Sequence, residues 1–539
     1  MNSEVSILSM IKELREAGVG DQEKLAFFEK VIGDLKKSLN NDDSNYVLNL
    51  YKTLDQTKLN NEKNSVDEEK IESFVKEKSI ENQDEKNVET KTLKKTVMDV
   101  RSLNRFVAGS IIDKLRGGQP PSYGIRTYSV GLESVLSVID KEQIENLEHC
   151  GSSFFKFIEA PYGSGKTHFI YQFRELTMTK DPGFANVLIK LDNKSTSIKD
   201  LEVVLIQIFR EIEFPKTLEQ IEECISNPVK CEEEVGFINQ LRIFLETKKN
   251  EFNNEVEFIK FLDKIRENVL KDSDNPPFSE AMIVLMDGII SKDYEKINDI
   301  SNFLQNKLEN SKMRKYNLKK ITNENAILFL KSLIRFLRNI GYSGLVVSFD
   351  ETEVKLAMND RKRIDAMKSV HSIFDQIYSF KLNNLIVLFS VLDKSQIISS
   401  GYGAIISRVT EEFSMVSPGN PWLNLEKIVK DNDDDYWKSN LRSIGRKIQR
   451  LYERSKEIKF DEDNMEETLE NMANVALKFK RGEIANKRSF IQKIIRVFDT
   501  IKANPDKIFS EDEARELFVG NGNPESDVNV DELKDDFEN

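Results

Sequence analysis

The sequence of 539 residues has few of the side chains that bind transition metals or build disulfide frameworks. It contains three cysteines and three histidines, and none of them lies at a spacing typical of a zinc site. No histidine has a companion that indicates a catalytic triad. Because the sequence shows no secretion signal, we interpret Cys150, Cys224 and Cys231 as reduced thiols.

Long apolar segments are also absent, since no apolar run reaches the roughly 18 residues of a membrane span. Residues 1–5 show neither the basic region nor the apolar region of a signal peptide. Apolar residues make up 39% and charged residues 32% of the chain, so it can bury a core and stay in solution. We therefore expect a cytoplasmic protein with several domains and no membrane segment.

The feature that the sequence does have is an apolar run, residues 154–158, followed by a glycine-containing loop that ends in Gly-Lys-Thr. This order predicts a strand, a phosphate-binding loop and a helix, with Lys166 on the phosphates and Thr167 on Mg²⁺. The strict pattern begins with glycine, where this chain has Ala160. The alternative is a surface turn beside a chance Lys-Thr pair. The expected nucleotide-binding residues are Ala160, Pro161, Tyr162, Gly163, Ser164, Gly165, Lys166, Thr167 and His168.

A second apolar run, residues 344–349, ends in Asp350 and Glu351. Adjacent carboxylates at the tip of a buried strand are costly unless they meet a cation. We expect Asp350 to hold the Mg²⁺ shell and Glu351 to activate water as a general base. The alternative is a strand that leaves the core at an acidic turn.

A third strand is expected at residues 385–393. Ser390 at its end is the candidate sensor of the γ-phosphate, with Asp393 as the next choice, although a serine there could simply pack. Arg408 follows and could stabilise γ-phosphate charge, either in cis or in a neighbouring subunit of a homo-oligomer. A solvated arginine is the other interpretation.

The net charge of −13 does not indicate a general polyanion binder. Residues 312–320 and 361–363 are nevertheless basic, and either segment could contact nucleic-acid phosphates or form a solvated helix face. The chain lacks an Asn/Thr-Lys-x-Asp element of the kind that recognises guanine, so ATP is the expected nucleotide.

Apolar spacing divides the chain into a small all-α module at residues 1–58 and a charged linker at 59–96. An ATPase core with a parallel α/β sheet is expected at 97–420, interrupted by a helical insertion at about 215–320. A helical C-terminal domain at 421–520 and an acidic tail at 521–539 complete the expected organisation. No fixed-period repeat is present.

Four segments resemble the BREX system ATP-binding proteins, a family of bacterial anti-phage defence. They are residues 158–169, 341–353, 112–131 and 486–491, and the similarity extends over roughly residues 100–505. The resemblance implies an AAA-like P-loop ATPase of the additional-strand class with a helical lid. Arg488 would be a second sensor arginine in that lid.

The resemblance also implies partners from the same defence system, such as a DNA methyltransferase, a phosphatase-like protein or a helicase. An ATP-driven switch or motor is the expected function. Two alternatives stay open at this point. The first is a nucleotide-gated scaffold that does not hydrolyse ATP and recruits an effector through residues 1–58. The second is a DNA-binding ATPase similar to origin-recognition proteins.

Overall fold

The computed structural model describes residues 98–191, 198, 200–252, 254–271, 274–352, 368–379, 381–398, 411–428, 433–479 and 487–519. The chain divides into two compact units, Met1–Lys91 and Thr92–Asn539, and every described residue belongs to the second unit. The expected N-terminal module, the charged linker and the acidic tail lie outside the described residues.

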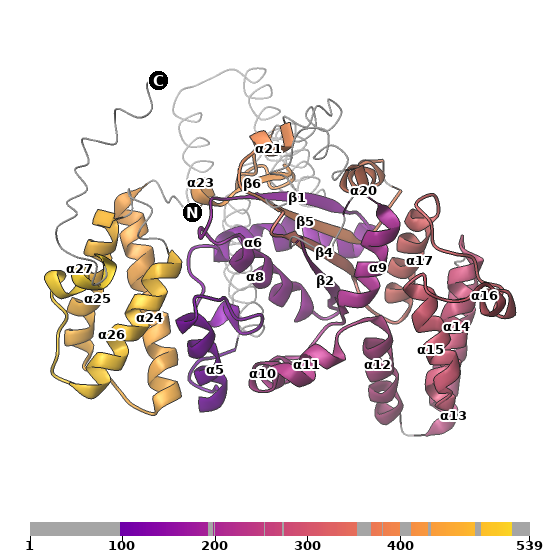
Figure 1. Ribbon diagram of the computed structural model, residues 1–539, viewed down its shortest axis with the longest axis horizontal. Coiled ribbons are helices and arrows are strands. Elements are labelled where there is room, and N and C mark those ends of the chain that lie inside the picture. The colour runs from indigo at the N-terminus through magenta and orange to yellow at the C-terminus, as the bar shows by residue number, and fades with distance from the viewer. Residues whose placement is uncertain are drawn as a thin grey trace, which may run out of the picture. The chain divides into compact units, whose positions relative to one another are not determined.

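A six-stranded sheet forms the centre of this unit, in the order β3-β2-β4-β5-β1-β6 (Figure 1). All neighbouring pairs are parallel except the edge pair of β2 with β3. The expected strands are confirmed within a few residues, whereas the short β3 and β6 were not predicted. The bounds are β1 Phe154–Glu159, β2 Phe184–Lys190, β3 Ile212–Glu213, β4 Gly344–Asp350, β5 Leu385–Val391 and β6 Trp422–Asn424.

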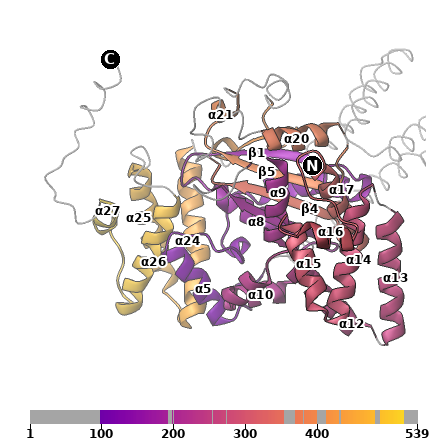
Figure 2. The same cartoon turned by 45° about the vertical axis from the view of Figure 1, so that its right-hand side comes forward.

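Helices cover both faces of the sheet, because the strands present apolar side chains alternately to two buried cores. One core includes α9, α17 and α20, and the other includes α5, α6 and α8 (Figure 2). The bounds are α5 Arg105–Arg116, α6 Glu133–Ile139, α7 Glu145–Cys150, α8 Lys166–Met178, α9 Leu201–Glu211, α17 Ala326–Asn339 and α20 Lys368–Tyr378; a 3-10 turn, η1, spans Ile125–Thr127, and a π-helical turn, η2, spans Asp140–Ile144.

The expected insertion consists of helices among its described residues, and it follows the edge strand β3. From α12 onward it packs on the α9–α17 face, whereas α10, α11 and the C-terminal helices pack on the α8 face. Within the described ranges, no helix combines the length and apolar character needed to cross a bilayer. The bounds are α10 Leu218–Ser226, α11 Pro228–Glu234, α12 Phe237–Glu251, α13 Glu255–Lys271, α14 Pro276–Ser291, α15 Tyr294–Leu304, α16 Asn310–Lys315, α21 Ser395–Ile398, α23 Leu425–Ile428, α24 Asp434–Lys456, α25 Glu462–Phe479, α26 Lys487–Ala503 and α27 Glu511–Val519.

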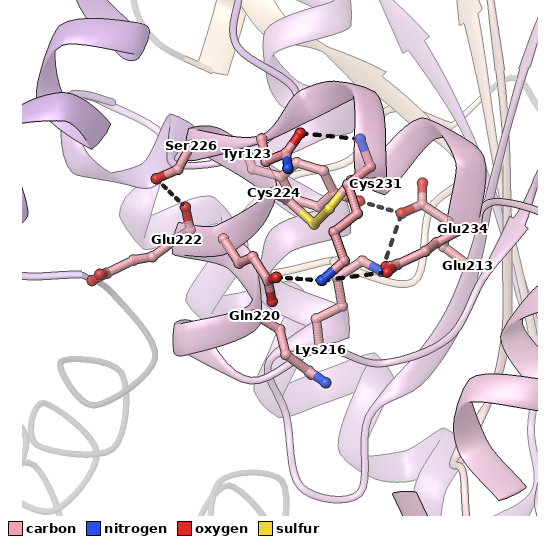
Figure 3. Close-up of a disulfide and its surroundings, with 12 residues drawn as sticks. Tyr123, Glu213, Lys216, Gln220, Glu222, Cys224, Ser226, Cys231 and Glu234 are labelled. Carbon is pink, nitrogen blue, oxygen red and sulfur yellow. Dashed lines mark hydrogen bonds and ion pairs between the residues drawn. A yellow bond between two sulfur atoms is a disulfide. The ribbon is translucent and has the colours of Figure 1, made fainter. Parts of the chain in front are cut away.

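One expectation about the cysteines is wrong. Cys224 and Cys231 form a disulfide that joins α10 to α11, and both side chains are buried (Figure 3). The chain reverses at Asn227, whose side chain caps α11, and this reversal brings the two Cα atoms within 5.3 Å. The spacing of the two cysteines in the sequence does not indicate this reversal. Cys150 is exposed and forms no disulfide, which agrees with the expected reduced thiol.

Candidate nucleotide site

The phosphate loop continues directly from β1 into α8. The Ala160 amide donates to the carbonyl of Val391, the last residue of β5, at 3.2 Å. The loop therefore begins where the carboxyl ends of β1 and β5 meet. Gly163 and Gly165 have φ values of 75° and 102°, which is backbone that side chains with a Cβ rarely adopt. The small Ala160 is fully buried and replaces the expected first glycine without interrupting the loop. The predicted strand, loop and helix are therefore present.

Lys166, the first residue of α8, is buried at 7% exposure. Its Nζ donates to the carbonyls of Ala160 at 2.8 Å and Pro161 at 3.3 Å. The same ammonium lies 5.3 Å from the ring centroid of Tyr162, a side chain that is 68% exposed. The loop thus supplies acceptors for its own lysine, and bound phosphates would compete for this ammonium.

Thr167 and Asp350 connect the two predicted motifs. The Thr167 hydroxyl donates to Asp350 Oδ2 at 2.7 Å, although the residues lie 183 positions apart. Asp350 ends β4 and is 1% exposed. Hydroxyl and carboxylate oxygens are hard ligands that suit Mg²⁺, which completes its shell with water and phosphate oxygens. The described residues contain no group of three or more His, Cys, Asp and Glu side chains that could hold a metal ion.

Glu351 differs from its neighbour in both conformation and exposure. It is exposed and has a φ of 57°, a left-handed conformation that is uncommon for a residue other than glycine. Such strained backbone clusters at functional sites. The turn at the end of β4 therefore leaves one carboxylate in the core and places the next one at the surface, where water is available.

Ser390 lies near the carboxyl end of β5, the strand between β4 and β1. Its position pairs with Ile158 of β1, and the preceding pair of β4 and β5 is Phe349 with Phe389, so Ser390 is the next neighbour of Asp350. Side chains at alternate positions of β5 pack into the core that contains α8, which puts Ser390 on the α8 face. Its side chain is fully buried, and its Oγ has no hydrogen-bond partner among the described residues.

His168 links the phosphate-binding helix to the C-terminal helices. The Ser129 hydroxyl donates to the Ile125 carbonyl at 2.7 Å, so its contact of 2.8 Å with His168 Nε2 requires a proton on that nitrogen. Burial and the nearby charge of Lys487 lower the pKa of His168 to about 4, and the imidazole is neutral. On the other side, Lys447 of α24 donates to the Ser129 carbonyl. This arrangement supports a structural role for the His168 side chain.

The structure describes one of the two arginine candidates. Arg408 lies outside the described residues. Arg488 is exposed in the first turn of α26, while the adjacent Lys487 is the residue whose charge acts on His168. Asp393, the second choice for the sensor, is exposed and accepts from the Ser395 amide at 2.6 Å. Their proposed roles remain predictions.

Sequence reasoning missed Glu159, the last residue of β1. Its carboxylate accepts from Trp422 Nε1 at 2.5 Å, from Asn424 Nδ2 at 3.0 Å and from the Lys394 amide at 3.2 Å. Glu159 thereby joins β1 to β6 and to the turn that follows the Ser390 strand. An acid at the end of an apolar run was the available signal, as it was for Asp350.

The sheet order now defines the class of protein. β5 lies between the phosphate-loop strand β1 and the acidic strand β4, which is the arrangement of P-loop NTPases with an additional strand. A family model described as BREX system ATP-binding protein BrxC/D matches residues 103–516, and the chain belongs to this family. Membership implies ATP as the ligand and other proteins of the BREX system as partners. The comparison with curated proteins finds no match.

Proposed function

We propose that this protein hydrolyses ATP and works as a switch or motor in a BREX-like anti-phage defence system. The observation that carries the proposal is the hydrogen bond between Thr167 and Asp350. It brings the phosphate loop and the acidic strand into one site, with Glu351 as the next residue and Ser390 on the adjacent strand. These are the groups that in-line phosphoryl transfer to water requires.

Each residue has a separate task in this proposal. Lys166 and the loop amides bind the phosphates, and Thr167 and Asp350 hold Mg²⁺. A bound Mg²⁺ ion would neutralise negative charge on the phosphate oxygens. Glu351 accepts the proton of the attacking water, and Ser390 donates a hydrogen bond to the γ-phosphate.

Movement and assembly form a second part of the proposal. Arg488 in the lid and Arg408 couple hydrolysis to movement of the C-terminal helices or of a neighbouring subunit. If Arg408 acts in trans, the protein functions as a homo-oligomer. The module at residues 1–58 docks a BREX partner such as the methyltransferase, the phosphatase-like protein or a helicase.

The test measures ATP binding and Mg²⁺-dependent ATP turnover of the full chain. Lys166→Ala should abolish nucleotide binding, because it removes the buried ammonium. Glu351→Gln should bind ATP normally and lose at least about 100-fold in turnover, since general bases contribute about 10²- to 10⁴-fold. Lys249→Ala and Glu246→Gln are matched controls, because both side chains are exposed on α12 and lie outside the site.

Unchanged ATP binding by Lys166→Ala would contradict the assignment of the loop. Normal turnover by Glu351→Gln would place the base elsewhere. Tight binding by the unmodified chain without turnover, with or without DNA, would favour the gated scaffold. The search would then move to the missing partner.

A further inference from the structure

The insertion contains a basic loop, residues 307–320, that the proposed ATPase cycle does not use. It carries six Lys and Arg residues and one carboxylate in a chain with a net charge of −13. Two of the six cations are neutralised within the fold. Lys312 Nζ lies 2.6 Å from the buried Asp299 carboxylate, and Lys315 Nζ lies 3.7 Å from Glu295. These two residues attach α16 to α15.

The other four cations of the basic loop are exposed. Among the residues that the structure describes, Arg314, Lys319 and Lys320 have no carboxylate within ion-pairing distance. Lys307 donates to Gln305 Oε1 at 2.9 Å, which is a neutral acceptor. Within the described part of the chain, four exposed cations of the basic loop, against the one exposed carboxylate of Glu309, therefore form no ion pair.

The backbone of the basic loop is held in place at both ends. The Asn306 side chain donates to the Ile321 carbonyl at 2.8 Å and accepts from the Ile321 amide at 3.1 Å. Lys307 and Lys320, the neighbours of these two residues, are thereby brought to the same end of the loop. The Leu318 amide donates to the Met313 carbonyl at 2.8 Å and closes the C-terminus of α16. The exposed cations thus extend from a fixed backbone, which lowers the entropy lost on binding a partner.

Three of the four apolar side chains of the basic loop are buried, and the fourth, Met313, is partly buried against the core. Leu308, Tyr316 and Leu318 are all buried, and the Tyr316 hydroxyl donates to Asp299 at 3.1 Å. An exposed aromatic would be needed to stack on a base, and exposed apolar groups would be needed to enter a bilayer. The surface therefore fits a polyanion that is recognised by charge alone.

The basic loop is connected to the edge of the sheet that carries the nucleotide site. Just beyond it, Asn323 donates to Asp200 Oδ1 at 3.2 Å and accepts from the Glu202 amide at 3.2 Å, at the start of α9. The segment before α9 follows β2, where the Leu191 amide donates to the Asp350 carbonyl at 3.0 Å. Figure 2 shows α16 beside α15 and α9 behind them, next to the strands.

We propose that the basic loop binds the phosphate backbone of a nucleic-acid duplex, independently of base sequence. Arg314, Lys319 and Lys320 would each contact a phosphate, with Lys307 beside them. Each such contact releases counterions, so binding should weaken steeply with salt. The proposal concerns binding and does not depend on ATP hydrolysis.

The experiment measures fluorescence anisotropy of a labelled DNA duplex of about 30 base pairs and arbitrary sequence with the full chain, between about 50 and 200 mM salt. The test variant combines Arg314→Gln, Lys319→Gln and Lys320→Gln. Its affinity should fall at least tenfold near 100 mM salt. The slope of log K against log salt should become shallower by about 3, because three phosphate contacts are lost and each contributes roughly 0.9 to the slope.

A matched control combines Lys249→Gln, Lys260→Gln and Lys264→Gln, which remove the same charge from exposed positions on α12 and α13. The control should keep both the affinity and the slope, and circular dichroism should show that both variants are folded. Equal losses in the two triple variants would reduce the effect to net charge and overturn the proposal. It would also be overturned by no loss in the test variant, by no DNA binding of the unmodified chain at low salt, or by binding to anionic phosphatidylserine vesicles in place of DNA.

Discussion

Replacing Ser390 by alanine should have opposite effects on stability and on turnover. The hydroxyl is fully buried and has no hydrogen-bond partner among the described residues. Burying an unpaired hydroxyl costs about 1–3 kcal/mol, and the alanine side chain keeps the Cβ that packs there. After a small loss of packing, we expect Ser390→Ala to stabilise the empty protein by about 1 kcal/mol. If the hydroxyl contacts the γ-phosphate, the same change should lower turnover about tenfold, which corresponds to about 1.4 kcal/mol in the transition state.

The assay is urea unfolding without nucleotide, followed by steady-state ATP turnover of the same preparations. For a unit of this size 1 kcal/mol shifts the melting temperature by only about 1 °C, so the urea midpoint at unchanged m-value is the better measure. Ser279→Ala is the matched control, because the Ser279 hydroxyl is also buried but donates to the Val269 carbonyl at 3.1 Å. That variant should lose about 1 kcal/mol. Destabilisation by Ser390→Ala, or turnover equal to that of the unmodified chain, would refute the assignment.

Two further predictions concern buried groups outside the site. Lys156 is 1% exposed and donates to the Asn420 carbonyl at 2.6 Å, and burial lowers its pKa to about 7. The unfolded chain holds this proton up to about pH 10.5, so folding must release it between about pH 7 and 10.5. The free energy of unfolding of the unmodified protein, relative to that of Lys156→Met, should therefore rise by roughly 3–5 kcal/mol over this range. A difference that does not change with pH would show that the amine is solvated. The Cys224–Cys231 disulfide closes a short loop, so its reduction should cost about 2.5 kcal/mol on the chain-entropy model, and iodoacetamide should label only Cys150 in denaturant without reductant. Labelling of all three cysteines would contradict the pairing.

The strands that carry the site were predictable, because each combines an apolar run with a polar residue at its carboxyl end. The phosphate-loop motif pointed to Thr167, and the cost of burying a carboxylate pointed to Asp350; the structure places the two side chains in contact, while their roles stay predictions. Sequence reasoning could not foresee that Glu351 adopts a φ of 57°, because local backbone strain depends on the surrounding packing. It also missed β6, whose three residues are too few to show a period.

Other features depend on how neighbouring helices fold back on one another, which residue types do not specify. The Cys224–Cys231 disulfide depends on a reversal of the chain at Asn227, and cysteine spacing does not encode it. The basic segment was expected to contact phosphates or to form a solvated helix face, and the sequence did not show that its Tyr316 is buried against α15. The role of Arg488 stays a prediction, and the structure adds that the charge of its neighbour Lys487 acts on the buried His168. Amphipathic spacing locates a helix, but it does not tell which buried group an individual charged residue approaches.

The residues of the candidate site differ in whether nucleotide binding must disturb a contact that they already make. Lys166 donates to carbonyls of its own loop, so bound phosphates must replace those contacts. The Thr167 hydroxyl can keep donating to Asp350 while the lone pairs of its oxygen contact a metal ion. Hydrogen bonds to charged phosphate oxygens are roughly twice as strong as those to neutral carbonyls, which favours the exchange for Lys166. Among the described residues the Ser390 hydroxyl has no hydrogen-bond partner, and Glu351 is exposed to water. Changes at the first three residues should therefore appear mainly in nucleotide affinity, and changes at the last two mainly in the rate of the chemical step.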